Sequence, residues 1–354
     1  MLIYWLLFAV PVAGSAIFTT GRTQRSAVPL IVLFGIFWIF YNIVSGSRYE
    51  IGGDWGNYLR IFNYIRLEKF TTSIGYNEVG FVILAKACDL LGLGINGINF
   101  FCSAVLSLGV ILLARRTEHP WLGIMAAVPY LLIVVGMGYI QQSAAIGFLI
   151  LAMLALFDRR LPRAICMGAL AISMHTASVV FLPLVAYMYV RENRHTIIPL
   201  SFLGLLGVIM VVAMGYWDKL NGGYIDAEYS SNGALVRLAM NAIPALIFLL
   251  FNKNLQITSR ERDFWTILSW SSIGLMLLYF VFPSSTVLDR VGLFFTPIQV
   301  FAFGNFSAML RNTKGLSSLS GVALLLYCGA VQFVWLVFAD NASSWVPYQS
   351  LFQI

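Results

Sequence analysis

The densest polar, glycine-containing stretch of the sequence, residues 48–58, reads RYEIGGDWGNY and places acidic residues, an arginine and glycines among aromatic side chains. Asp54 has the carboxylate that a general base needs to take a proton from a hydroxyl group, and Arg48 can bind a phosphate through paired donors. An acid with arginines fits the transfer of a sugar from a phosphate-linked donor, because the arginines stabilise the departing phosphate. Asp54 is therefore our first candidate for the base, or for an acid that positions the acceptor.

Further candidates for chemistry come from segments spread along the chain. They are Glu78 as a second catalytic acid, and Tyr58, Gln141, Gln142, His175, Arg237 and Arg290 as substrate-binding residues. Asp54 and Glu78 both precede apolar stripes, so helix capping is the alternative for each. Arg48 can instead extend toward a membrane interface, and His175 can be a hydrogen-bonded structural residue, although polar residues inside a membrane are often functional. Asp289 is expected to be the local partner of Arg290.

The composition predicts an all-α polytopic membrane protein with a single domain over residues 1–354. Of the 354 residues, 60% are hydrophobic and only 10% are charged, whereas a soluble domain has roughly a quarter charged residues. The net charge of +7 does not indicate nucleic-acid binding, because the basic residues form short clusters between apolar runs. The four cysteines form no CxxC pair, and no metal or cofactor is expected, since arginines can neutralise a leaving phosphate.

About ten apolar runs are long enough to cross a membrane as helices. They are residues 2–19, 27–45, 95–114, 120–137, 139–157, 196–216, 234–252, 264–283, 291–311 and 317–338. Small residues at 13–16 leave a cleaved signal peptide as the alternative for the first run. The basic clusters between the runs are assigned to the cytoplasm by the positive-inside rule. Segment 46–77, the loops 217–233 and 284–290, and both termini then lie outside.

Two amphipathic segments on the outer side are expected to lie on the membrane surface as interfacial helices. In residues 54–66, the stripe Trp55, Tyr58, Leu59, Phe62 and Ile65 has helical spacing. In residues 78–93, Glu78, Lys86 and Asp89 lie opposite Phe81, Leu84, Cys88 and Leu91. Only one crossing is allowed between the outer loop and Arg115, and residues 95–114 supply it.

Residues 163–190 lie between two basic clusters that are both expected inside. The segment is about 42 Å long as a helix, too short for two full spans. A re-entrant or broken helix pair, with its tip near residues 173–176, satisfies both ends. A long, kinked single helix is the alternative, and it would violate the charge bias.

Four stretches of the sequence resemble EpsG-type, Wzy-like polysaccharide polymerases, which make O-antigen, capsule or exopolysaccharide. Residues 48–58 resemble the family's outer-loop motif, an arginine followed by G-x-D-[WY]-x-x-Y. Residues 78–81 resemble its E-x-G-F helix and residues 139–145 its glutamine-alanine segment. Residues 171–177 resemble its A-x-x-x-H-x-[ST]-A element, except that Thr176 follows His175 directly. The match extends over about residues 45–190, with a looser match at Arg290. Gln141 stands where the family usually has an arginine, so Arg48, Arg237 or Arg290 would have to bind the phosphate.

The resemblance implies a GT-C-like membrane glycosyltransferase in the bacterial inner membrane, with its active site on the periplasmic or extracytoplasmic face. Such an enzyme would transfer a growing glycan from undecaprenyl pyrophosphate to a hydroxyl of the next lipid-linked repeat unit. A chain-length regulator and a flippase are the expected protein partners. Two alternatives remain open: a glycosyltransferase that adds one sugar from a polyprenyl-phosphate donor, and a lipid-linked oligosaccharide flippase.

Overall fold

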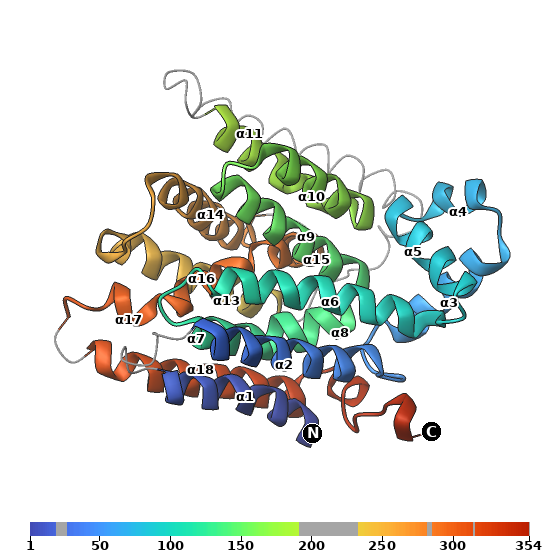
Figure 1. The fold of residues 1–354 in the computed structure, drawn as a ribbon, viewed down its shortest axis with the longest axis horizontal. Coiled ribbons are helices and arrows are strands. Elements are labelled where there is room, and N and C mark those ends of the chain that lie inside the picture. The colour runs from blue at the N-terminus through green and yellow to red at the C-terminus, as the bar shows by residue number, and fades with distance from the viewer. Residues whose placement is uncertain (19–26, 191–232, 282–284, 314–315, 354) are drawn as a thin grey trace.

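The computed structural model describes residues 1–18, 27–190, 233–281, 285–313 and 316–353, and in this part of the chain all regular elements are helices (Figure 1). The all-α fold is thus confirmed. In chain order the helices are α1 (Leu2–Phe18), α2 (Ala27–Gly46), α3 (Trp55–Leu67), α4 (Phe70–Tyr76), α5 (Val79–Leu90), α6 (Gly94–Ala114), α7 (Pro120–Ala127), η2 (Val128–Val135), α8 (Gly136–Gly138), α9 (Ile140–Phe157), α10 (Leu161–Met174), η3 (Thr176–Phe181), α11 (Leu182–Val190), α13 (Ala234–Phe251), η4 (Asn252–Asn254), α14 (Ser259–Leu278), α15 (Ser285–Gly292), η5 (Leu293–Phe295), α16 (Pro297–Gly304), α17 (Phe306–Met309), α18 (Leu316–Phe338), η6 (Ala342–Ser344) and η7 (Leu351–Gln353).

The expected count of about ten spans is not confirmed. Among the described residues, five helices are long and apolar enough to cross a membrane, or six if the bent pair that contains α15 and α16 is counted as one span. Helix α14 falls short because charged residues fill its first turn, at positions 260–263. The described apolar parts of α1 and α2 are also shorter than a full span. The expected span 196–216 lies outside the described residues.

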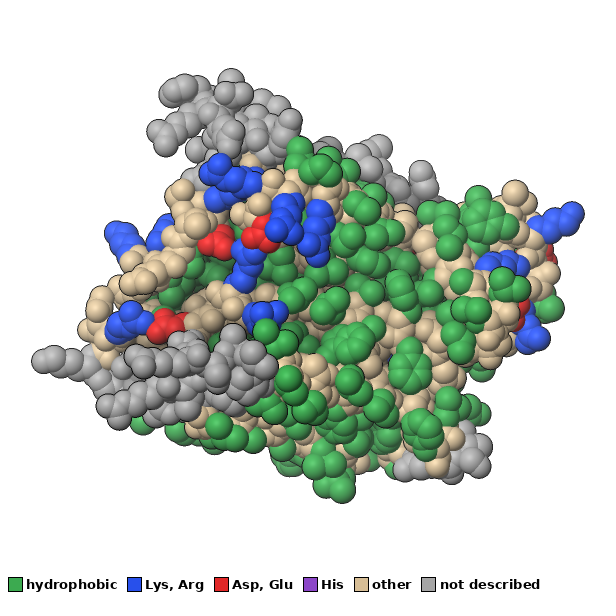
Figure 2. Space-filling model, in the orientation of Figure 1, with side chains coloured by type: hydrophobic (Ala, Val, Ile, Leu, Met, Phe, Trp, Pro, Cys, Tyr) green, Lys and Arg blue, Asp and Glu red, His purple; other side chains and the backbone are tan. Residues whose placement is uncertain are grey.

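The centre of the bundle consists of two helices that are apolar on all sides. The continuous helix from Pro120 to Gly138 is entirely buried, and α9 is almost entirely buried between α6 and α10. A helix without a polar face belongs in the interior of a large bundle. The helix α18, by contrast, exposes most of its apolar surface. Figure 2 shows a broad hydrophobic band across the middle of one face, with Lys and Arg gathered toward the two ends of the molecule.

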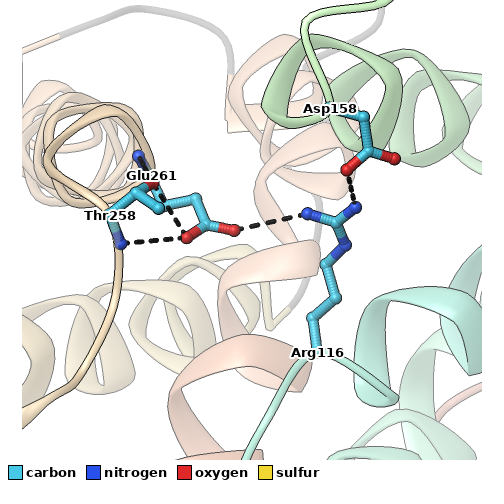
Figure 3. A network of polar contacts seen from close by, with 4 residues as sticks. All are labelled: Arg116, Asp158, Thr258 and Glu261. Carbon is cyan, nitrogen blue, oxygen red and sulfur yellow. Dashed lines mark hydrogen bonds and ion pairs between the residues drawn. The ribbon is translucent and has the colours of Figure 1, made fainter.

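One end of the bundle is held together by ion pairs between loops. Arg116, at the end of α6, contacts Asp158 after α9 and lies 3.4 Å from Glu261 at the start of α14 (Figure 3). Glu261 also forms a capping box with Thr258, which begins α14. Arg311 pairs with Glu118 at the same end, where His119 donates to the carbonyl of Gly304. The described basic clusters therefore lie together, as the charge pattern predicted; their membrane side remains a prediction.

The opposite end carries a lobe made of α3, α4 and α5 (Figure 1). The stripe predicted for α3 is buried at Trp55, Tyr58, Phe62 and Ile65, but Leu59 is exposed. In α5 the buried face is Phe81, Val82, Ala85 and Cys88, and the predicted Leu91 is exposed. An ion pair of 3.2 Å between Arg66 and Asp89 joins the two helices. The short helix α4 between them was not predicted.

Residues 161–190 form a broken helix pair, as predicted. Helix α10 ends at Met174, His175 has an extended backbone with φ −157° and ψ 116°, and η3 and α11 return along the bundle. Arg260 donates to the carbonyl of Met188, which places the end of α11 beside the start of α14. Both ends of the pair therefore lie at the end of the bundle that Arg116 occupies, and the single kinked helix is excluded.

The expected loop at 284–290 is wrong for the residues that the structure describes. Residues Ser285–Gly292 form the helix α15, and the expected continuous span 291–311 is interrupted. The pair Ser285–Phe295 and Pro297–Gly304 bends by 45° near Thr296. Pro297 has no backbone N–H to continue the hydrogen-bond ladder, and this explains the break. The bend brings α15 toward the lobe, so that Arg290 on α15 lies near Asp54 at the start of α3.

Candidate active site

The loop before α3 turns sharply and places Asp54 at the N-cap position of α3, where the lobe begins. Glu50 and Gly52 both have positive φ, at 53° and 105°, and a conformation of that kind favours glycine. A Cβ on Gly52 would lie 2.8 Å from the carbonyl oxygen of Met137, so the loop also needs glycine for its close approach to α8. The amide of Trp55 donates to the carbonyl of Gly52 at 3.0 Å, which closes the turn.

Asp54 faces Arg290, from a helix more than 200 residues later in the chain. A carboxylate oxygen of Asp54 and a guanidinium nitrogen of Arg290 are 3.8 Å apart. The two side chains are 36% and 38% exposed, so a ligand can reach both. Asp54 occupies the cap position of α3, but its side chain makes no capping hydrogen bond. The carboxylate is thus directed to an ion pair, and the capping alternative does not describe this structure.

Arg290 is held from two other sides. Its guanidinium lies over the ring of Tyr139, with 4.2 Å between the guanidinium carbon and the ring centroid. The side-chain amide of Gln142 donates to the backbone carbonyl of Arg290 at 2.7 Å. Tyr139 and Gln142 belong to the break between α8 and the start of α9. A charged group stacked on an aromatic face and fixed at its backbone is preorganised for a bound anion.

Tyr58 lies one helical turn after Asp54, at the base of this group. Burial raises the pKa of the Tyr58 phenol well above its ordinary value, and the nearby charge of Asp54 raises it further. Arg290 and the backbone of Gln141 act in the opposite direction. The phenol therefore stays protonated at neutral pH and offers a hydrogen bond. Gln141 itself is half-buried, and Gln142 is buried.

A second pair, Glu78 with His175, lies between α5 and the break in the helix pair. Nδ1 of His175 is 3.5 Å from a carboxylate oxygen of Glu78, and the side chains are 16% and 19% exposed. Glu78 occupies the cap position of α5 but makes no side-chain capping bond. The helices approach closely here, because a Cβ on Gly80 would lie 2.8 Å from the carbonyl oxygen of Ser173. The glycine of the E-x-G-F motif thus has a packing reason.

Aromatic contacts connect the two pairs. The rings of Tyr58 and Phe81 are 6.2 Å apart, which joins the helix that follows Asp54 to the helix that follows Glu78. The ring of His175 meets the edge of Phe294, one turn after Arg290, with centroids 6.0 Å apart. The structure therefore brings Asp54, Tyr58, Gln141, Gln142 and Arg290 together, with Glu78 and His175 beside them.

Arg237 forms an ion pair with Asp289, the residue that was expected to pair with Arg290. Two of its nitrogens contact the carboxylate oxygens of Asp289 at 2.7 and 3.0 Å. Asp289 is therefore the partner of Arg237, not of its neighbour Arg290. The two adjacent residues on α15 point to different partners, and a paired fork of this kind neutralises Arg237. Arg290, whose contact to Asp54 is longer, is the better candidate for a substrate phosphate.

Arg48 does not join this group, contrary to expectation. Its side chain is fully buried, and its guanidinium donates to the carbonyl and hydroxyl oxygens of Ser45 and, at 2.9 Å, to Asn99. Burial lowers its pKa to about 10, so it remains charged at neutral pH. A buried charge that is already hydrogen-bonded cannot reach a phosphate without rearrangement. In this structure Arg48 stabilises the base of the loop.

Two parts of the site were not predicted from the sequence. Tyr139 was read only as the start of the glutamine segment, although an aromatic residue directly before two glutamines is a usable signal. The residues after α18 pair with residues 47–52, and the sequence carries no local pattern that indicates this. No group of three or more His, Cys, Asp or Glu residues placed to hold a metal ion occurs in the described part of the chain.

Comparison with known proteins identifies one family. Residues 31–350 match the model of the EpsG family, and this range includes every candidate residue of the site. No curated protein and no solved structure matches the chain.

Proposed function

The chain belongs to the EpsG family, and from that membership and the geometry of the site we propose that it polymerises lipid-linked oligosaccharide repeat units. The family supports a polysaccharide-polymerase type of function and a membrane location. In the proposed reaction, a growing glycan moves from undecaprenyl pyrophosphate to a hydroxyl of the next lipid-linked unit. The observation that carries this proposal is the exposed pair of Asp54 and Arg290.

The proposed chemistry divides between the two members of that pair. The carboxylate of Asp54 accepts the proton of the acceptor hydroxyl as its oxygen attacks the anomeric carbon of the donor sugar. The bond between that carbon and the pyrophosphate oxygen breaks, and the pyrophosphate leaves with the electron pair. Arg290, whose guanidinium lies over Tyr139 and 3.8 Å from Asp54, stabilises the charge that grows on the leaving oxygen.

The pair of Glu78 and His175 supplies a second set of polar groups beside the first. We assign it to the acceptor sugar, because a carboxylate and an imidazole can hydrogen-bond hydroxyl groups and move a proton between them. Gln141, Gln142 and Tyr58 lie beside the pair of Asp54 and Arg290. The whole site lies at the end of the bundle that the charge pattern assigns to the extracytoplasmic side. In this proposal the protein lies in the bacterial inner membrane, and undecaprenyl pyrophosphate enters the site from the lipid bilayer.

The test is Asp54→Asn, expressed in a strain that lacks its own polymerase. The control is Asp89→Asn, since Asp89 is an aspartate of the same lobe whose partner is Arg66. Surface polysaccharide is run on a gel after the abundance of each variant has been measured. We expect a single repeat unit from Asp54→Asn and a full ladder from Asp89→Asn. A full ladder from abundant Asp54→Asn refutes the role of Asp54. If the wild-type protein adds only one sugar, it is a single-sugar transferase and not a polymerase.

A further inference from the structure

The residues that follow α18 form a segment that lies against the loop of the site. This C-terminal segment, residues 341–353, contains only the short helices η6 and η7. The amide of Gly52 donates to the carbonyl of Ser344 at 2.9 Å, and the amide of Tyr49 donates to that of Gln349 at 3.0 Å. The amide of Leu351 donates back to the carbonyl of Ser47 at 2.9 Å. The loop before Asp54 thus hydrogen-bonds along its length to the end of the chain.

Trp345 in this segment reaches the other half of the site. Its side chain is only 2% exposed, and its carbonyl accepts a hydrogen bond of 2.8 Å from the hydroxyl of Tyr4. Two carbons of its indole ring lie 3.2 and 3.3 Å from the place where a Cβ of Gly138 would be. Gly138 directly precedes Tyr139, whose ring lies under Arg290. Trp345 therefore packs against the backbone that supports the arginine.

We propose that the C-terminal segment positions the Asp54–Arg290 pair, and that Trp345 is its main positioning residue. Ser344 fixes Gly52, two residues before Asp54, and the adjacent Trp345 fixes Gly138, one residue before Tyr139. Two neighbouring residues of one segment thus set both sides of a contact of 3.8 Å. A misplacement of about 1 Å in a catalytic group can cost about 100-fold in rate, so this support has a large effect on turnover. The inference rests on the proposed polymerase function.

A second contact of the same segment provides a milder test. The hydroxyl of Tyr348 donates to the carbonyl of Val44, in the last turns of α2, at 2.7 Å. Tyr348→Phe removes this bond and keeps the ring. Tyr327→Phe is a matched control, because Tyr327 is a partly buried tyrosine on α18 that packs against Phe303 at a distance from the segment.

The experiment compares Trp345→Leu with Trp265→Leu, because both remove a fully buried indole. Trp265 stacks on Phe301, with centroids 4.0 Å apart, and its ring also contacts Phe157 and Phe264, which are not candidate site residues. Initial polymerisation rates are measured per folded molecule at varied concentrations of lipid-linked repeat unit. We expect kcat to fall about 10- to 100-fold for Trp345→Leu and about threefold for Tyr348→Phe, with KM nearly unchanged. Trp265→Leu and Tyr327→Phe should keep the wild-type kcat per folded molecule.

The outcomes separate this inference from the proposed function. The inference is overturned when both variants of the segment keep the wild-type kcat, or when their losses equal those of the controls. If Trp345→Leu does not accumulate, the kcat of Tyr348→Phe alone decides whether the inference holds. Each of these comparisons requires that the wild-type protein polymerises and that Asp54→Asn does not. A wild-type protein that makes no polymer refutes the proposed function, and positioning is then tested by the distance between spin labels on the loop and α9.

Discussion

The close approach of α5 and α10 at Gly80 makes Gly80→Ala a sensitive probe of the second pair. A Cβ at this position would lie 2.8 Å from the carbonyl oxygen of Ser173, and this contact must lengthen by about 0.6 Å to become an ordinary one. Glu78 precedes Gly80 by two residues, and His175 follows Ser173 by two residues. The shift therefore passes directly to the pair, whose contact of 3.5 Å would increase beyond the roughly 4 Å limit for an ion pair.

The energetic sign of Gly80→Ala follows from two opposing terms. Alanine is better than glycine in a helix by about 0.8–1.0 kcal/mol. Overpacking against a backbone carbonyl costs about 1–3 kcal/mol, because the oxygen cannot rotate away. The second term is larger, so we expect a net loss of stability of up to about 2 kcal/mol and a polymer yield reduced at least about 10-fold.

The control for Gly80→Ala is Gly56→Ala in the neighbouring helix α3. A Cβ on Gly56 would meet nothing within 4 Å, so this variant gains the helix propensity without the clash. Thermal unfolding in detergent measures stability, and the polysaccharide ladder measures activity. If Gly80→Ala unfolds at the temperature of Gly56→Ala and gives the same ladder, the contact between α5 and α10 is not required, and our reasoning on the second pair is wrong.

Three further predictions concern other parts of the fold. Arg290→Gln should reduce the rate of polymerisation about 100- to 1,000-fold, and Arg290→Lys less, since lysine keeps the charge but lacks paired donors; equal single-turnover rates would contradict this. Gly52→Ala should lower stability by about 1–3 kcal/mol in thermal unfolding, because residue 52 has a φ of 105° and a Cβ there would lie 2.8 Å from the carbonyl oxygen of Met137. An unchanged unfolding temperature would show that the loop can relax. Arg116→Ala should destabilise the protein by about 1 kcal/mol, since it leaves two carboxylates without their common partner, whereas the exposed neighbour in Arg115→Ala should have no effect on the same unfolding curve.

The sequence predicted those parts of the fold that depend on local pattern. The stripe of Trp55, Tyr58, Phe62 and Ile65 has the helical period, and these residues are buried on one face of α3. The break at His175 followed from charge, because basic clusters at both ends of 163–190 required the chain to return. The short helix α4 was missed, since Phe70–Tyr76 is too short for a periodic signal.

Contacts between distant segments could not be predicted in the same way. Asp54 and Arg290 were both candidates, but no pattern indicated that they meet, because α15 was expected to be a loop. The pairing of Asp289 with Arg237 was missed because adjacency to Arg290 suggested a local partner. Arg48 was expected to bind phosphate, but the packing buries it fully and hydrogen-bonds it to Ser45 and Asn99. Such pairings depend on how helices pack, and composition does not determine them.

The bridge between Arg48 and Ser350 also has a consequence for biosynthesis. The two residues are about 300 positions apart, so this contact forms only after the ribosome has translated residue 350. At roughly 5–20 residues per second, the loop waits on the order of 15–60 seconds for the segment that holds it. The nascent protein is inserted in the membrane during this interval without a completed site. A chain released before residues 341–353 are translated should therefore reach the membrane but remain inactive.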